Sequence, residues 1–329
     1  MSESARRTLI VIAVQVIPLV VGQLAMRRGL ARKEWGKPLS RFIIYFFNTG
    51  VASMSPLYLP HEVGMVKLLA ISVLFCGGIT FAGVAMSRVH RSHTGPERGA
   101  YIIGSALSNY GFTMAGFVCY IFFQEKALAM QTVFLFPVVC FIFMVWFSIG
   151  RYYGTEVKDV GLAGSFLMIF KDVTSLPLAG IIVGIALNRW GGVGPSEVDS
   201  LKTFLRVNPR LILKVLVYAG TMASMFCIGI TLDLGSVLGF NRENLSIAVV
   251  KFVAGPVIGY GLATLFGATG MERQVVVILS CVPVGLFTSF AANLFGLNRD
   301  LANSLFVVNT AAFLFVIFPI LVLVLPHLA

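Results

Sequence analysis

Long apolar segments follow one another through almost the whole chain, from Leu9 to Leu325, with only short polar breaks between them. A helix needs roughly 20 apolar residues to cross the hydrocarbon core of a bilayer. The 329 residues are 57% hydrophobic and 12% charged, which is more apolar surface than a water-soluble domain can bury. The sequence therefore predicts a polytopic membrane protein.

The charged breaks divide the chain into ten predicted spans. All ten are expected to be helices, because lipid offers no hydrogen-bond partner to an open backbone. The alternation of polar and apolar residues that marks a membrane β-barrel is missing from the sequence. The predicted spans are 8–26, 39–59, 64–87, 99–122, 128–150, 172–190, 211–232, 246–266, 273–295 and 301–325.

Basic residues gather in alternate breaks, with six after the first span and three each after the third and fifth. Because cytoplasmic loops carry the excess of Lys and Arg, the odd-numbered breaks are predicted to be cytoplasmic and both termini to lie outside the cell (plasma or inner) membrane. The connection 189–214 is an exception, since it is predicted to be external yet is rich in basic residues: Arg189, Lys202, Arg206, Arg210 and Lys214.

We interpret residues 1–329 as a single transmembrane domain made of two halves of five spans, about 8–150 and 172–325. An odd number of spans makes the second half enter the membrane from the opposite side, which is an inverted repeat. Spans four and nine both carry small or helix-breaking residues at their centres, Ser108–Gly111 and Pro283–Gly285. Interrupted helices at matching positions indicate a binding site near the bilayer midplane. The alternative is that these small residues only allow close helix packing.

These segments also carry a family resemblance. The stretch Lys251-Phe252-Val253-Ala254-Gly255-Pro256 resembles the basic-Phe-x-x-Gly-Pro stretch in span eight of auxin efflux carrier (PIN-like) proteins. Three further segments are similar to the same family: Ser108-Asn109-Tyr110-Gly111-Phe112, Thr231-Leu232-Asp233-Leu234, and Pro283 followed by Asn293-Leu294-Phe295-Gly296 and Asp300-Leu301.

The resemblance implies an all-α membrane protein with ten helices, a 5+5 inverted repeat and crossing broken helices four and nine. This is the fold of sodium/proton antiporters and bile-acid symporters, within the bile/arsenite/riboflavin transporter superfamily. It also implies transport of organic anions. The chain departs from plant auxin carriers in lacking their long central hydrophilic loop, and it reads Asn48-Thr49-Gly50 where the family often has a proline in span two.

We expect the anion to bind where the broken helices expose half-helix N-termini, since these ends carry free N–H groups and partial positive charge. Polar residues of spans two and ten are expected to complete the site, although isolated Ser and Thr often bond to their own helix instead. The predicted binding residues are Asn109, Tyr110, Gly111, Pro283, Val284, Gly285, Asn48, Thr49, Ser53, Asn309 and Thr310.

Lys251 lies about five residues inside span eight. One interpretation is that it attracts the anion or forms a gating charge pair with Asp233 at the end of span seven. The other is that its long side chain reaches back to the cytoplasmic interface.

No Asp or Glu lies at the centre of a predicted span, so the sequence does not support a proton-driven mechanism with a midplane acid. Sodium coupling stays open, because carbonyl oxygens, Asn and Thr of unwound helices can bind sodium. Uniport stays open too, since the membrane potential supplies roughly 2.3 kcal/mol per charge per 100 mV. The predicted function is a secondary active transporter or uniporter of a small carboxylate by alternating access. The alternatives are a sodium-coupled bile-acid-type symporter and a non-transporting membrane sensor.

The sequence shows none of the motifs of intramembrane or hydrolytic enzymes, so we expect no enzyme. The four histidines lie in breaks or in the tail, and no metal site or cofactor is expected apart from the open question of sodium: His61, His90, His93 and His327. The expected partners are the organic anion and membrane lipids, not nucleic acid, and a homodimer is left open.

Overall fold

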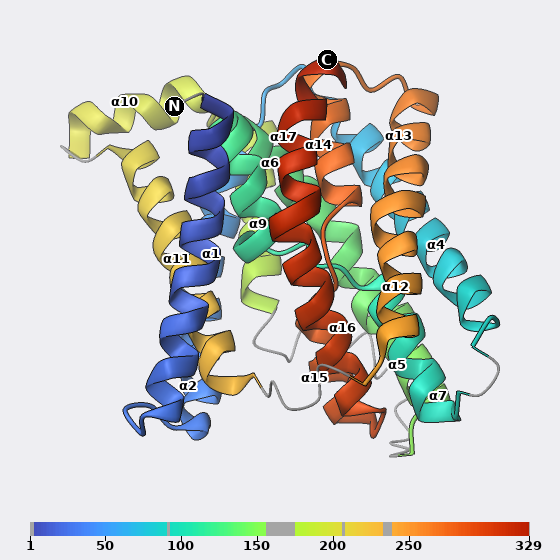
Figure 1. Cartoon of the computed structure of the whole chain (residues 1–329). Helices are drawn as coiled ribbons and strands as arrows, with labels where there is room; N and C mark the ends of the chain where they lie inside the picture. Colours follow the sequence, from blue (N-terminus) through green and yellow to red (C-terminus); the bar gives the residue numbers. More distant parts are fainter. Residues whose placement is uncertain (1–2, 91–92, 156–174, 206–207, 233–238, 329) are drawn as a thin grey trace. The chain divides into compact units, whose positions relative to one another are not determined.

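Figure 1 shows the computed structural model of the chain, which describes residues 3–90, 93–155, 175–205, 208–232 and 239–328. Within these ranges every regular element is a helix, as predicted, and no strand occurs. The chain forms two compact units, which are described separately here. The first unit comprises Met1–Leu69, Gly111–Phe136 and Lys171–Leu232, and the second comprises Ala70–Tyr110, Pro137–Phe170 and Asp233–Ala329.

Six helical stretches are long and apolar enough to cross a membrane, which makes the chain a multi-pass membrane protein: Ala5–Arg27, Met65–Ser87, Phe112–Tyr153, Pro209–Thr231, Asn241–Leu265 and Arg299–Leu328. Fewer continuous spans appear among the described residues than the ten predicted. The predicted span two is divided into short helical segments between Gly36 and Tyr58. The predicted spans four and nine are interrupted, and the second half of span four runs on into span five. Leu176–Arg189, in the predicted span six, is a shorter apolar helix.

The first unit is built around two long helices, α1 (Glu3–Arg27) and α11 (Pro209–Thr231), which lie side by side (Figure 1). A Cβ atom on Gly22 of α1 would collide with the carbonyl oxygen of Phe226, and one on Gly229 of α11 with that of Leu19. Small residues at these positions therefore allow the two backbones to approach closely, as is common between membrane helices.

The other helices of the first unit are shorter. They are α2 (Gly36–Phe42), α3 (Thr49–Met54), α9 (Ser175–Arg189), α10 (Pro195–Leu205) and the first part of α6 (Phe117–Phe141). Helix α3 packs on α9, again through glycines. Inside α6 the chain kinks at Gln124, which has φ 57° and ψ −142°. This kink marks the predicted boundary between spans four and five.

The basic connection 189–214 is tied to the first unit by its own charges. The Arg189 guanidinium donates hydrogen bonds to the carbonyls of His61 and Val63, at 3.0 and 3.1 Å. Arg210 forms an ion pair with Asp199 of α10. Glu197 lies in the first turn of α10. Hydrogen bonds from its own backbone N–H, from the Ser196 hydroxyl and from the Gly194 N–H lower the pKa of its carboxyl group. Arg189 and Arg210 thus both have structural partners within the first unit.

The second unit contains most of α4 (Met65–Ser87) together with α5 (Gly95–Ala106), α7 (Phe147–Tyr153) and the C-terminal helices. The latter are α12 (Asn241–Val249), α13 (Gly255–Leu265), α14 (Gly270–Ser280), α15 (Phe287–Phe295), α16 (Arg299–Ala312) and α17 (Phe318–Val324). Helix α5 begins with a reciprocal cap between Thr94 and Glu97, and Asn298 caps α16 through the Leu301 N–H.

Candidate functional site

Two helices of the second unit stop partway, at the positions that the sequence singles out. Helix α5 ends at Ala106, and Leu107 already has an extended backbone with φ −82° and ψ 102°. Helix α14 ends at Ser280, and α15 begins only at Phe287. Pro283 lies in the gap between α14 and α15 and brings no N–H to a helical ladder.

The two unwound segments bind each other. The Asn109 N–H donates to the Pro283 carbonyl at 2.8 Å, and the Gly285 N–H donates to the Leu107 carbonyl at 2.9 Å. Ser108 and Val284 form an isolated antiparallel β-bridge between these bonds. Each break thus supplies partners that the other backbone lost, which is what permits non-helical chain inside an apolar unit. We call this pairing the crossing.

Glycine has different roles in the two interruptions. A Cβ on Gly285 would lie 2.7 Å from Leu107 Cδ2 and 2.8 Å from the Ser108 carbonyl oxygen, so the close approach at the crossing requires glycine there. A Cβ on Gly111 would meet nothing within 4 Å, and its backbone is extended with φ −68°. Gly111 therefore leaves open space beside the break rather than serving close packing.

Lys251 reaches the crossing. It lies in a π-helical segment, Val250–Ala254, between α12 and α13, and its side chain is only 1% exposed. Its Nζ donates a 2.6 Å hydrogen bond to Ser108 Oγ. The interpretation that this lysine reaches back to the membrane surface is therefore wrong. Asp233, its predicted partner, lies outside the described residues.

Several buried polar atoms near this end of the second unit have no hydrogen-bond partner among the described residues. They are Thr288 Oγ1 and Ser289 Oγ on α15, and Asn309 Oδ1 and Thr310 Oγ1 on α16. The amide of Asn309 is held by Asn244 of α12, at 3.4 Å, and by the carbonyl of Leu305. Buried polar atoms are nearly always paired, so these four atoms are candidates to bind water or a ligand.

The predicted residues of span two belong to the first unit, whereas the crossing belongs to the second. Thr49 Oγ1 donates to the Ile44 carbonyl at 2.9 Å, and Ser53 Oγ to the Thr49 carbonyl at 2.8 Å. Both hydroxyls thus bond to their own helix, which is the alternative that the sequence left open. Asn48 is half-buried at the start of α3.

Sequence reasoning missed a basic cavity of about 460 Å³ in the first unit. Its charged lining residues are Arg6, Arg7, Arg210, Lys214 and Glu125. They come from three segments that are all predicted to lie outside: the N-terminus, the break after span four and the connection 189–214. The signal was present in the sequence, since the excess of basic residues in 189–214 breaks the usual charge rule.

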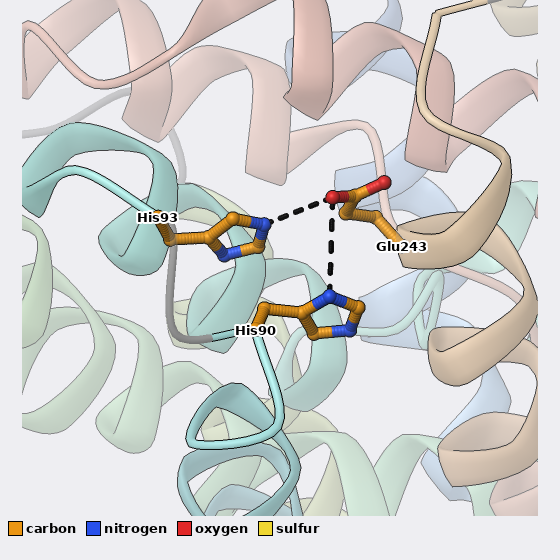
Figure 2. Close-up of side chains that lie close together, drawn as sticks. All are labelled: His90, His93 and Glu243. Carbon is orange, nitrogen blue, oxygen red and sulfur yellow. Dashed lines mark hydrogen bonds and ion pairs between the residues drawn. The ribbon is translucent and has the colours of Figure 1, made fainter.

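Sequence reasoning also missed a group of three side chains in the second unit (Figure 2). His90 and His93, between α4 and α5, point toward Glu243 in the first turn of α12, with one potential metal-ligand atom from each residue within 4.8 Å of the others. Burial and then the nearby His93 lower the pKa of His90. Sequence reasoning could not bring these side chains together, because Glu243 is 150 residues from His93 in the chain yet adjacent to it in space. The expectation that no metal binds stays a prediction.

A comparison with protein families bears on this architecture. The family described as "Membrane transport protein" matches residues 203–322. This match supports an auxin efflux carrier-like membrane transporter. It confirms the predicted resemblance over the part of the chain that carries Lys251, Pro283, Gly285 and Asn309. Asn109 lies before the matched residues. No curated protein matches the chain.

Proposed function

We propose that the protein transports a small organic anion, a carboxylate, across the cell membrane by alternating access, as a secondary active transporter or uniporter. The observation that carries this proposal is the crossing in the second unit, where two unwound backbones pair and the buried Lys251 bonds to Ser108. A membrane protein that needed only packing would have no use for two interrupted helices and a buried lysine at one point.

The chemistry of Lys251 supports an anionic substrate. Its described polar partner is a neutral hydroxyl, and an ammonium buried without a negative charge is costly. A carboxylate bound at the crossing would offset that cost. The unpaired hydroxyls of Thr288 and Ser289 on α15 could donate hydrogen bonds to the same carboxylate.

The basic cavity of the first unit also supports a negatively charged substrate. Four of the five charged residues that line it are Arg or Lys. A concave basic surface raises the local concentration of anions and speeds their capture. In the proposed orientation, with both termini outside, this cavity would meet anions on the external side.

We favour uniport or another sodium-independent mode over sodium symport. Sodium sites at a helix crossing need free carbonyl and amide oxygens. Here the Leu107 and Pro283 carbonyls accept hydrogen bonds across the crossing, and a lysine already reaches it. Two unit positive charges 4 Å apart repel by about 4 kcal/mol at an effective dielectric constant of 20.

The proposed architecture is ten spans arranged as a 5+5 inverted repeat. The breaks in spans four and nine, the fourth span of each half, support it. In this arrangement the predicted binding residues Asn109, Tyr110, Val284 and Thr310 of the second unit would contact substrate.

The test is a flux assay with the purified protein in liposomes. Labelled mono- and dicarboxylates are offered with an imposed membrane potential, in sodium-containing and sodium-free buffers, and the same acids are screened for thermal stabilisation of the detergent-solubilised protein. We expect one class of carboxylate both to stabilise the protein and to enter liposomes at a rate that follows the potential.

Other outcomes would contradict the proposal in different ways. Flux that requires sodium would favour the bile-acid-type symporter. Stabilisation by an acid without any flux would favour the membrane sensor. A protein that neither binds nor moves any carboxylate would end the anion proposal.

A further inference from the structure

Three side chains of the second unit that could bind a metal lie close together: His90 and His93, from the connection between α4 and α5, and Glu243 of α12. His90 comes three residues after Ser87, the last residue of α4, and His93 directly precedes Thr94, the cap of α5. Glu243 lies in the first turn of α12. Figure 2 shows both imidazole rings directed at the same carboxylate oxygen, Oε1 of Glu243.

The distances suit a small cation. His93 Nε2 lies 3.0 Å and His90 Nδ1 lies 3.9 Å from Glu243 Oε1. Zinc binds imidazole nitrogen and carboxylate oxygen at about 2.0–2.2 Å, which places neighbouring ligand atoms of a tetrahedral site roughly 3.3 Å apart. The two imidazole rings stack nearly parallel, with centroids 4.8 Å apart and 6° between their planes, so one ring must turn before both nitrogens face one ion.

The hydrogen bonds around the group suit the tautomer of His90 that would bind a metal through Nδ1. Ser246 Oγ donates its hydrogen to the Glu243 carbonyl at 3.0 Å. With its hydrogen placed there, its oxygen can accept from the Tyr101 hydroxyl, 2.7 Å away, and from a hydrogen on His90 Nε2, 2.8 Å away. With the hydrogen on Nε2, neutral His90 directs the lone pair of Nδ1 at the carboxylate. Two acceptors thus face each other, and a cation between them would bind both.

The same hydrogen bonds form the support that protein metal sites usually have. A metal-binding histidine normally donates its other ring N–H to a fixed acceptor, which orients the ring. Ser246 is that acceptor for His90, and it is itself held by Tyr101 of α5. The side chains are also largely sheltered, with His93 6%, His90 11% and Glu243 17% exposed.

We infer that His90, His93 and Glu243 form a zinc site that joins the α4–α5 connection to α12. Two imidazoles and one carboxylate are ligands typical of zinc, with the fourth position left for water. The ion would tie together two helices that lead to the crossing, since α5 ends just before Ser108 and α12 leads into the segment with Lys251. This inference does not depend on which substrate the protein carries.

The test uses the full chain without a polyhistidine tag, in detergent or nanodiscs, stripped with a chelator and freed of it by gel filtration. Bound zinc is measured by mass spectrometry after equilibration with limiting zinc chloride, and thermal unfolding is followed with increasing zinc. We expect about one zinc per chain and a thermal midpoint that rises with zinc concentration.

Four variants localise the site. His93→Gln and Glu243→Gln should lose stoichiometric zinc and the zinc-dependent rise in midpoint. Ser246→Ala removes only the support of His90 and should weaken zinc binding about 10–100-fold. His327→Gln, which changes an exposed histidine of the C-terminal segment, should bind zinc like the unchanged protein.

Three results would overturn the inference. One is an unchanged protein that retains no stoichiometric zinc, or that binds magnesium or calcium instead. Another is equal zinc affinity in His93→Gln, Glu243→Gln and the unchanged protein. The third is loss of zinc from His327→Gln. Because the first result needs no variant, misfolding of a variant cannot hide it.

Discussion

Lys251 is the residue whose environment is hardest to explain by packing alone. Its side chain is 1% exposed, and among the described residues its hydrogen-bond acceptor is the uncharged Ser108. Burying an ammonium in this way works against folding, so we expect the lysine to be kept for binding rather than for stability.

Lys251→Met should therefore separate stability from binding. Removing the buried ammonium should raise the free energy of unfolding by roughly 1–3 kcal/mol. The same change should weaken binding of the stabilising carboxylate at least about 30-fold, because loss of one partner of a buried charge pair costs about 2–5 kcal/mol. Both effects are read from thermal unfolding in detergent, with and without the anion.

Lys126→Met is the matched control, since Lys126 is exposed at the break between spans four and five. It should change neither quantity. A Lys251→Met protein that binds the anion as tightly as the unchanged protein would remove Lys251 from the proposed site.

Among the elements, the crossing depends on how closely two backbones can approach. Gly285 lies against Leu107 and Ser108 with no space for a side chain. The pairing of Asn109 with Pro283 and of Gly285 with Leu107 needs this approach.

Gly285→Ala should push the two unwound segments apart. We expect a loss of about 1–3 kcal/mol in unfolding free energy, as for other overpacked positions, together with loss of the anion-induced shift in midpoint. Gly77→Ala in α4 is the control, because its Cβ would meet nothing within 4 Å. That control should be neutral or gain up to about 1 kcal/mol. Equal behaviour of the two variants would show that the crossing tolerates a wider separation.

The helical elements and their interruptions could be read from the sequence because their causes are local. Runs of apolar residues predict helices, and Pro283 and the small residues around Asn109 mark where the helices stop. What the sequence could not supply is which distant side chains meet. Ser108 lies 143 residues from Lys251, and His93 lies 150 residues from Glu243. The hydroxyls of Thr49 and Ser53 show the same limit, since polarity alone did not reveal that they bond to their own helix.

For the whole molecule, the distribution of charge is the feature that sets its expected orientation. The basic cavity joins the N-terminus, the break after span four and the connection 189–214 within the first unit. Their common location is in line with the sequence prediction that all three lie on one side of the membrane.

Cysteine labelling tests that orientation in cells. After removal of the five native cysteines, single cysteines are placed at the exposed Lys126 and Arg88. A membrane-impermeant maleimide should label position 126 in intact cells, and position 88 only after permeabilisation, because the break after span three is predicted to be cytoplasmic. The reverse pattern would invert the proposed topology.

The kink at Gln124 has a practical consequence for anyone who wishes to purify this protein. Its backbone, at φ 57° and ψ −142°, occupies a region that is essentially reserved for glycine and costs other residues about 1–3 kcal/mol. Gln124→Gly should relieve that strain and, after the extra chain entropy of glycine, leave a net gain of about 1 kcal/mol. If the melting temperature in detergent rises accordingly, this one substitution offers a sturdier starting material for crystallisation or cryo-microscopy.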